Sequence, residues 1–158
     1  MLKMIPKTFS WTFSVMDGSE AVARAVDRSW WSDKGELTIQ GITYTARRER
    51  PMSGAFLLES AAGVVARATK PSAFRRSLIV EHAGRQYTLR ATSAFRRTFV
   101  LLDGSTRIGS LSPEGLFTRR AAVDLPPTFP LDVRVFIIWL TAMLWKHEEA
   151  AGGAAAAG

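Results

Sequence analysis

Paired arginines are the side chains of this sequence best suited to binding chemistry. Arg75-Arg76 and Arg96-Arg97 occur in two similar segments of the chain. A guanidinium group can form two parallel hydrogen bonds with phosphate oxygens, so clustered arginines are typical of anion sites. The candidate residues of such a phosphate-binding rim are Lys70, Arg75, Arg96, Arg119 and Arg120.

Motifs for catalysis or for metal binding are absent from the sequence. The chain contains no Cys, which excludes disulfides, thiolate catalysis and Cys-ligated metals. His82 lies beside a Gly turn and His147 follows the last apolar segment, and neither has a second His at ligand spacing. No nucleophile elbow, Gly-rich phosphate loop or paired-carboxylate motif occurs. We therefore expect a protein that is not an enzyme and has no cofactor and no metal.

The chain is basic, and its excess charge is concentrated in one region. The formal net charge is +7, from 21 Lys and Arg against 14 Asp and Glu. Residues 47–120 contain 14 basic and five acidic residues, a net charge of +9. This charge favours anionic partners such as phosphates, lipid head groups or nucleic acid. The alternative is a solvated, Arg-rich surface without a ligand.

Short apolar segments on either side of Gly turns predict β-hairpins. Thr8–Val15 alternates apolar and polar residues and predicts a half-buried strand. Ser19–Trp31 fits a strand or a helix, and we favour a strand that ends at Trp30-Trp31. The predicted hairpins are Leu37–Ile39 with Ile42–Thr45, Gly54–Leu58 with Val64–Ala68, Ser77–Val80 with Tyr87–Leu89, and Thr98–Leu102 with Arg107–Leu111.

An internal repeat indicates how these hairpins assemble. Ser72–Val80 recurs as Ser93–Leu101, 21 residues later, and each copy is followed by a Gly turn. Each hairpin has one apolar face that only its neighbours can cover, which is typical of a closed antiparallel barrel or a meander.

The last apolar segment predicts a helix, because Val135–Trp145 is apolar except for Thr141. Asp132 is placed to cap its start, and Lys146 and His147 follow at its negative end. Eleven helical residues span about 16 Å, whereas a bilayer core needs about 20 residues. We therefore expect the helix, residues 132–147, to be enclosed by protein, with a disordered Ala/Gly-rich tail at 148–158. Trp11, Trp139 and Trp145 are expected in the core, and one residue of Trp30-Trp31 is a candidate surface anchor.

A barrel with a central helix gives the arginine pairs a second, structural interpretation. Because side chains alternate along a strand, Arg76 and Arg97 point toward the core, and Arg75 and Arg96 point outward. The inward pair would lie at the barrel mouth and bond helix-end carbonyls or Asp132, while the outward pair would be solvated. Structural ion pairs are commoner than ligand sites, which favours this interpretation.

Several of these segments together resemble a known family. The matching features lie between about Thr38 and Trp145: Gly54-x-Phe56-x-Leu58, Ala66-x-Ala68-x-Lys70, the Phe74 and Phe95 hairpins, Arg107–Leu111, and Pro130-Leu131 with the helix that follows. They resemble the tubby C-terminal-like group, which includes phospholipid scramblases and LURP-one-related proteins. The resemblance implies twelve strands around a buried C-terminal helix, and it makes phosphoinositide binding conceivable.

The chain also departs from that group. It has no Cys for palmitoylation, no acidic calcium-loop pattern and no Pro-rich N-terminal region of the scramblase kind. Lipid scrambling is therefore not carried over, and no ligand residue of the family can be matched to a position in this sequence.

Taken together, the sequence predicts a mainly β protein: one barrel domain, residues 1–147, of about twelve antiparallel strands around a buried helix. No apolar run of signal-peptide length follows the N-terminal lysines, so we expect a cytoplasmic protein. Its basic surface would place it at the periphery of the membrane, and we take it as a monomer by default. The leading function is a binding or scaffold domain for anionic phospholipid or phosphoinositide surfaces. The alternatives are a nucleic-acid-binding barrel, a structural protein without a ligand, and an enzyme or carrier whose ligand would compete with the helix for the lumen.

Overall fold

A computed structural model describes the chain except for residues 9, 29–32, 72–75, 93–96, 116–117 and 158, with only the backbone at 153–157. The described residues form twelve strands followed by one helix. The strands are β1 (Leu2–Pro6), β2 (Phe13–Asp17), β3 (Glu20–Asp27), β4 (Lys34–Ile39), β5 (Ile42–Arg48), β6 (Ala55–Ser60), β7 (Gly63–Thr69), β8 (Ser77–His82), β9 (Arg85–Ala91), β10 (Phe99–Asp103), β11 (Thr106–Pro113) and β12 (Ala121–Asp124), and the helix is α1 (Leu131–Ala157).

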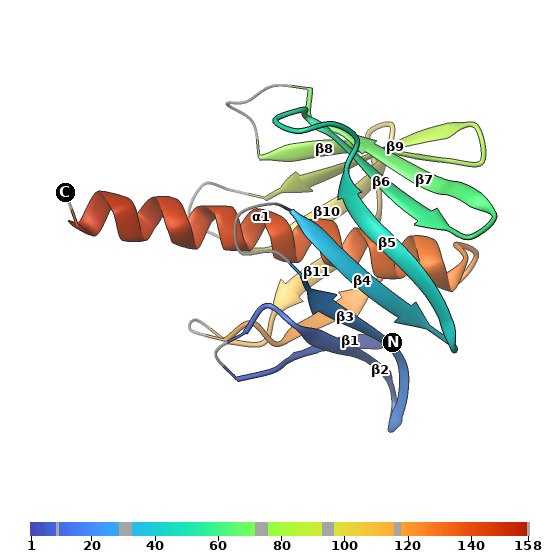
Figure 1. The fold of residues 1–158 in the computed structure, drawn as a ribbon, viewed down its shortest axis with the longest axis horizontal. Helices are drawn as coiled ribbons and strands as arrows, with labels where there is room; N and C mark the ends of the chain where they lie inside the picture. Colours follow the sequence, from blue (N-terminus) through green and yellow to red (C-terminus); the bar gives the residue numbers. More distant parts are fainter. Residues whose placement is uncertain (9, 29–32, 72–75, 93–96, 116–117, 158) are drawn as a thin grey trace.

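The strands form one closed antiparallel barrel around α1 (Figure 1). Strands that follow each other in the chain are neighbours in the barrel, and β1 pairs with β12 to close it, with Leu2 opposite Val123. Side chains alternate as the hairpin pattern requires: Leu78 and Val80 of β8 are fully buried, and Ile79 between them is only partly buried. The predicted fold class, a closed antiparallel barrel around a buried C-terminal helix, is confirmed.

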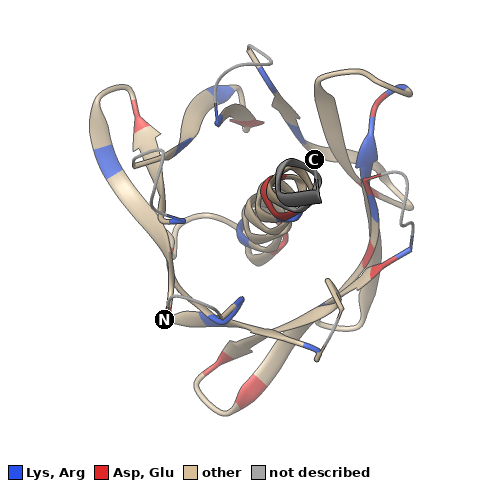
Figure 2. Cartoon of the chain, turned by 90° about the vertical axis from the view of Figure 1, so that its left-hand side faces the viewer, with Lys and Arg blue, Asp and Glu red and all other residues tan. Residues whose placement is uncertain are grey.

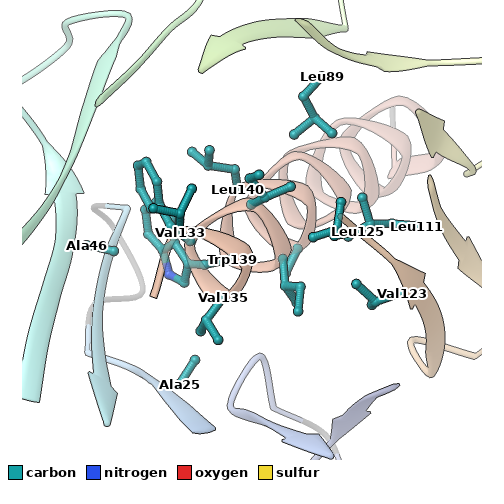
Figure 3. Close-up of a cluster of buried hydrophobic side chains, with 14 of the residues drawn as sticks. Ala25, Ala46, Leu89, Leu111, Val123, Leu125, Val133, Val135, Trp139 and Leu140 are labelled. Carbon is teal, nitrogen blue, oxygen red and sulfur yellow. The ribbon is translucent and has the colours of Figure 1, made fainter. Parts of the chain in front are cut away.

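Helix α1 occupies the lumen of the barrel. Every residue of Val135–Trp145 is buried, because strands surround the helix. This explains why the helix is apolar on all faces. Figure 3 shows Val135 pointing toward Ala25 of β3. The one polar residue, Thr141, donates its hydroxyl hydrogen to the Ile137 carbonyl at 3.0 Å. In the part of the chain that the structure describes, no helix is long and apolar enough to cross a bilayer.

Close packing between helix and barrel explains a glycine in β4. A Cβ atom at Gly35 would lie 2.5 Å from Nε1 of Trp139, well inside van der Waals contact. Trp139 also stacks on Phe136, with ring centroids 6.2 Å apart, and meets Phe56 of β6 edge-on. A large aromatic residue therefore fits beside β4 only because that position has no side chain.

The start of α1 agrees with the prediction made from the sequence, and its end does not. Asp132 lies in the first turn as expected, and its carboxylate accepts hydrogen bonds from the Val133 amide at 2.8 Å and from the Tyr44 hydroxyl at 3.4 Å. The helix was expected to end at residue 147, whereas α1 continues to Ala157, into the segment 148–158 that was expected to be a disordered tail. Alanine is the strongest helix former, and Glu148 and Glu149 form ion pairs with the barrel.

The four hairpins predicted from the Gly turns are all present, as β4–β5, β6–β7, β8–β9 and β10–β11. The predicted strand Thr8–Val15 is wrong in extent, because β2 begins at Phe13. Ahead of β2, the Lys7 amide instead donates to the Thr12 carbonyl at 2.8 Å, and the Ser10 amide donates to the Lys7 carbonyl at 3.2 Å. Ser19–Trp31 contains a strand, β3, as favoured, and Trp30-Trp31 lies outside the described residues. Strands β1 and β12 were not predicted.

Candidate anion-binding site

The two ends of the barrel differ in length of connection and in charge. Five connections at one end are two-residue turns, 18–19, 40–41, 61–62, 83–84 and 104–105, and none contains a charged residue. The six connections at the other end, 7–12, 28–33, 49–54, 70–76, 92–98 and 114–120, have six or seven residues each. By sequence these six contain ten basic and three acidic residues. Longer connections at one end of a rigid scaffold are where binding residues concentrate.

Helix α1 leaves the barrel at this basic end (Figures 1 and 2), which we call the helix-exit mouth. Four consecutive charged or titratable residues, Lys146–Glu149, follow the last buried residue, Trp145. Successive residues of an α-helix are rotated by about 100°, so these four side chains point around the whole circumference. Each one therefore meets a different part of the surrounding barrel.

The barrel offers an acidic partner to Lys146 and to His147 and a basic partner to Glu148 and to Glu149, and we call these contacts the collar. Lys146 Nζ lies 2.9 Å from Asp27 Oδ2, and His147 Nε2 lies 2.8 Å from Asp33 Oδ1. The remaining pairs are Glu148 with Arg76, Glu149 with Arg119 at 3.1 Å, and Glu149 with Arg97 at 3.7 Å. The partners follow one another around the barrel in strand order, which fixes the rotation of the helix.

The arginines of the collar also pack on aromatic rings. Arg119 lies over Trp11 at 4.0 Å from the ring centroid, and Arg97 lies over Trp145 at 4.9 Å. Trp145 Nε1 in turn donates a hydrogen bond to the Arg97 carbonyl at 3.0 Å. Cation–π contacts of this kind stabilise partly desolvated arginines. Arg76 and Arg97 thus point inward at the mouth as the structural interpretation required, but they pair with Glu148 and Glu149 and not with helix-end carbonyls or Asp132.

Asp33 is the most enclosed acid of the mouth among the described residues, with a side chain only 9% exposed. It accepts hydrogen bonds from His147 and from Arg48, whose Nη2 lies 2.8 Å from Oδ2. Burial acts to raise the pKa of Asp33, but the hydrogen bond and charge of His147, together with Arg48, outweigh it and hold the pKa below its usual value. His147 is therefore a partner of a buried carboxylate, and the expectation that it marks the end of the helix is corrected.

A groove of about 820 Å³ lies between the collar and the β5–β6 connection. We call it the basic groove, because six of its lining residues are basic: Lys34, Arg47, Arg48, Arg50, Lys146 and His147. Several of these cations are neutralised within the protein; Arg47, for example, lies 2.6 Å from Glu59. Lys34 and Arg50 are exposed and have no ion-pair partner among the described residues. Lys70 lines an adjoining cavity of about 280 Å³ and is also without such a partner.

Of the residues predicted for a phosphate rim, the three that the structure describes do not line one common groove. Lys70 borders the cavity beside the basic groove, whereas Arg119 is held by Glu149, Trp11 and the Ser10 carbonyl. Arg120 is exposed and is not part of the groove lining. Arg75 and Arg96 lie outside the described residues. Of the five predicted residues, only Lys70 is thus seen beside the groove.

The sequence interpretation missed Lys34, Arg50, Met52 and the partners of Asp33. A usable signal existed, because the connections alternate between two residues and six or seven, and the basic residues fall in the longer ones. Of the two histidines, His147 contacts Asp33, and His82 lies beside Phe129, with ring centroids 5.9 Å apart. Within the described ranges, no three His, Asp or Glu side chains are grouped closely enough to hold a metal ion.

Fold and groove together define a helix-filled antiparallel β-barrel with one basic, long-looped mouth. Comparison with protein-family models, with curated proteins and with solved structures gave no significant match. The resemblance to the tubby C-terminal-like group therefore stays a prediction, and what this protein does has to be argued from its own residues.

Proposed function

We propose that the protein is a non-enzymatic binding domain that attaches to anionic phospholipid surfaces through its helix-exit mouth. The proposal rests on three cations around the basic groove that have no ion-pair partner within the described part of the chain: Lys34, Arg50 and Lys70. Anionic membranes attract basic surface residues by about 1 kcal/mol for each Lys or Arg near the surface. Three such residues on one mouth supply a useful part of the affinity of a peripheral protein.

The exposed side chain of Met52 supports a membrane partner in particular. Met52 lines the groove together with Arg50, is 97% exposed, and has φ +61°, a conformation that costs energy for any residue with a side chain. A strained backbone that presents an apolar side chain to water indicates a function for that side chain. By sequence, each of the six connections at this mouth also contains a large apolar residue. Apolar residues beside cations are typical of proteins that bind at the membrane interface.

A nucleic-acid partner has less support from the described residues. Stacking on bases requires exposed aromatic rings beside cations. The large apolar side chains that are exposed in the described part are Met1, Ile42, Met52 and Val64, and none of them is aromatic. The same cations could still contact nucleic-acid phosphates, so a labelled oligonucleotide belongs in the test.

Co-sedimentation with vesicles tests the proposal. We expect the protein to sediment with vesicles that contain phosphatidylserine or a phosphoinositide, and not with phosphatidylcholine alone. Charge reversal in Lys34→Glu/Arg50→Glu/Lys70→Glu should reduce this binding by about a hundredfold or more, since three attractive charges become repulsive. Sedimentation across a lipid titration gives the affinities.

The matched control reverses three other exposed arginines, in Arg24→Glu/Arg90→Glu/Arg107→Glu. These residues belong to β3, β9 and β11 and likewise lack an ion-pair partner among the described residues, so the net charge changes equally. The control should keep most of the binding. Equal losses in both variants, or no binding to any anionic vesicle, would contradict a site at the mouth, and oligonucleotide binding that only the groove variant loses would transfer the site to nucleic acid.

A further inference from the structure

The cavity of about 280 Å³ beside the basic groove is lined by both apolar and charged side chains. A surface that bound anions by charge alone would not need the apolar ones. Its apolar part is formed by Phe56 of β6 and by Met143 and Leu144 of α1, all of them buried side chains of the core. Its polar lining includes Arg48, His147 and Lys70. The cavity thus joins the apolar interior of the barrel to the charged mouth.

The basic residues around this cavity differ in whether they already have a partner within the protein. Arg48 and His147 are both engaged with Asp33, and Arg48 also lies over the Phe56 ring at 4.9 Å from its centroid. Lys70 has no ion-pair partner among the described residues, while its amide donates to the Gly54 carbonyl at 2.7 Å and fixes its backbone beside the cavity. One available cation therefore adjoins an apolar recess.

We propose that this cavity binds an apolar chain of an anionic amphiphile, whose charged group lies at Lys70. The inference rests on the proposed function and names the part of the lipid that the protein recognises. The cavity is too small for a whole lipid, since sites for drug-sized ligands occupy roughly 300–1,000 Å³. Met52 lines both this cavity and the basic groove, and its flexible thioether side chain suits a chain of variable shape.

Gly54 offers a way to fill the cavity without straining the backbone. It lines the cavity, its φ is not positive, and a Cβ there would lie 3.4 Å from the Lys70 carbonyl oxygen and 3.5 Å from the Lys70 Cβ, in ordinary contact. Gly54→Leu therefore places apolar atoms where the ligand chain would lie. Gly115→Leu is the matched control, because Gly115 belongs to another connection of the same mouth and, among the described residues, its Cβ would meet only Thr118, at 3.4 Å.

The test is calorimetric titration of the full chain with decyl phosphate below its critical micelle concentration, with inorganic phosphate and decanol in parallel. We expect one molecule of decyl phosphate to bind, at least about tenfold more tightly than inorganic phosphate, because several methylenes are buried. Gly54→Leu should weaken decyl phosphate binding by about tenfold or more, and Gly115→Leu should leave it unchanged. Lys70→Met should weaken decyl phosphate binding and leave decanol binding as it is.

Two results would overturn the inference. In the first, decyl phosphate binds no more tightly than inorganic phosphate; in the second, the Gly54→Leu variant binds decyl phosphate as tightly as the wild-type protein does. Thermal unfolding of each variant shows that it is folded before titration. If vesicle binding depends on Lys34, Arg50 and Lys70 but decyl phosphate fails to bind, the chain-binding cavity is wrong and the membrane-binding mouth stands. If decyl phosphate binds but vesicles do not, the membrane function is wrong instead.

Discussion

Asp33 connects three parts of the molecule that are distant in the chain. It lies just before β4, and it accepts hydrogen bonds from Arg48 at the end of β5 and from His147 in α1. Arg48 extends the connection further, because it also donates to the Ser53 carbonyl in the β5–β6 connection. This one carboxylate therefore holds the wall of the basic groove against the helix.

Substitution of Asp33 should be costly at neutral pH. Asp33→Asn removes a buried negative charge from beside Arg48 and His147, and we expect the free energy of unfolding at pH 7 to fall by about 2 kcal/mol. Because the pKa of Asp33 is lowered in the folded protein, its contribution is complete above its unfolded pKa of about 3.9 and is lost as the pH falls through the folded pKa. Urea unfolding at pH 7, 5 and 3 measures the difference, which should shrink only at the lowest pH. Asp103→Asn, in a more exposed pair with Arg85, should change stability by less than about 1 kcal/mol, and an equal loss in both variants would contradict a special role for Asp33.

Individual site residues were harder to predict than their chemical type. The abundance of arginine correctly indicated a basic surface, but which cations remain available depends on partners that are remote in sequence. Arg119 is neutralised by Glu149, thirty positions away, whereas Arg50 has no ion-pair partner among the described residues. Lys34 shows the same difficulty, because its neighbour Asp33 is already engaged by α1. Local sequence cannot reveal such pairings.

At the scale of elements, the relation between α1 and the barrel depends on the collar as well as on apolar packing. Glu149 is the member that contacts two arginines, Arg97 and Arg119, from different connections. Its side chain is 45% exposed, so each single pair should contribute little. A substitution at Glu149 tests the joint effect of the two pairs on the position of the helix end.

Reversal of the charge at Glu149 tests that coupling. Glu149→Lys places a third cation beside Arg97 and Arg119, and we expect it to lower stability by about 1 kcal/mol. Adding Arg119→Glu restores an opposite pair and should recover part of the loss. Urea midpoints of the wild-type chain, both single variants and the double variant give the coupling energy, which should decrease at about 1 M salt because screening weakens partly exposed pairs. A coupling energy of zero would mean that the collar pair has no energetic role.

Most elements could be predicted because their signals are local. A Gly turn between two β-branched segments identifies a hairpin within about a dozen residues, and the apolar run of α1 is visible directly. Strands β1 and β12 were not predicted, because each of them is short and they pair with each other although about 120 residues separate them in the sequence. The extension of α1 beyond His147 was missed because the long-range partners of Glu148 and Glu149 were not visible from sequence.

For the whole molecule, barrel and helix should unfold as one unit. The apolar residues of α1 and the inward faces of the strands belong to one buried cluster, so each covers the other. Leu140→Ala removes a fully buried side chain at this interface and should lower the free energy of unfolding by about 3 kcal/mol. Tryptophan fluorescence and far-ultraviolet circular dichroism, followed in urea, should shift together in the variant. Two separated transitions would show that the barrel persists without its helix.

The pairing of β1 with β12 also determines when the molecule can be completed during folding. Every other strand pairs with neighbours in the chain, so hairpins can form early and locally, whereas the closing pair brings Leu2 beside Val123. Helix α1 comes after both of these strands in the chain and yet lies inside the ring that they complete. The apolar core inside this ring can therefore be completed only when α1, which follows all the strands in the chain, is present.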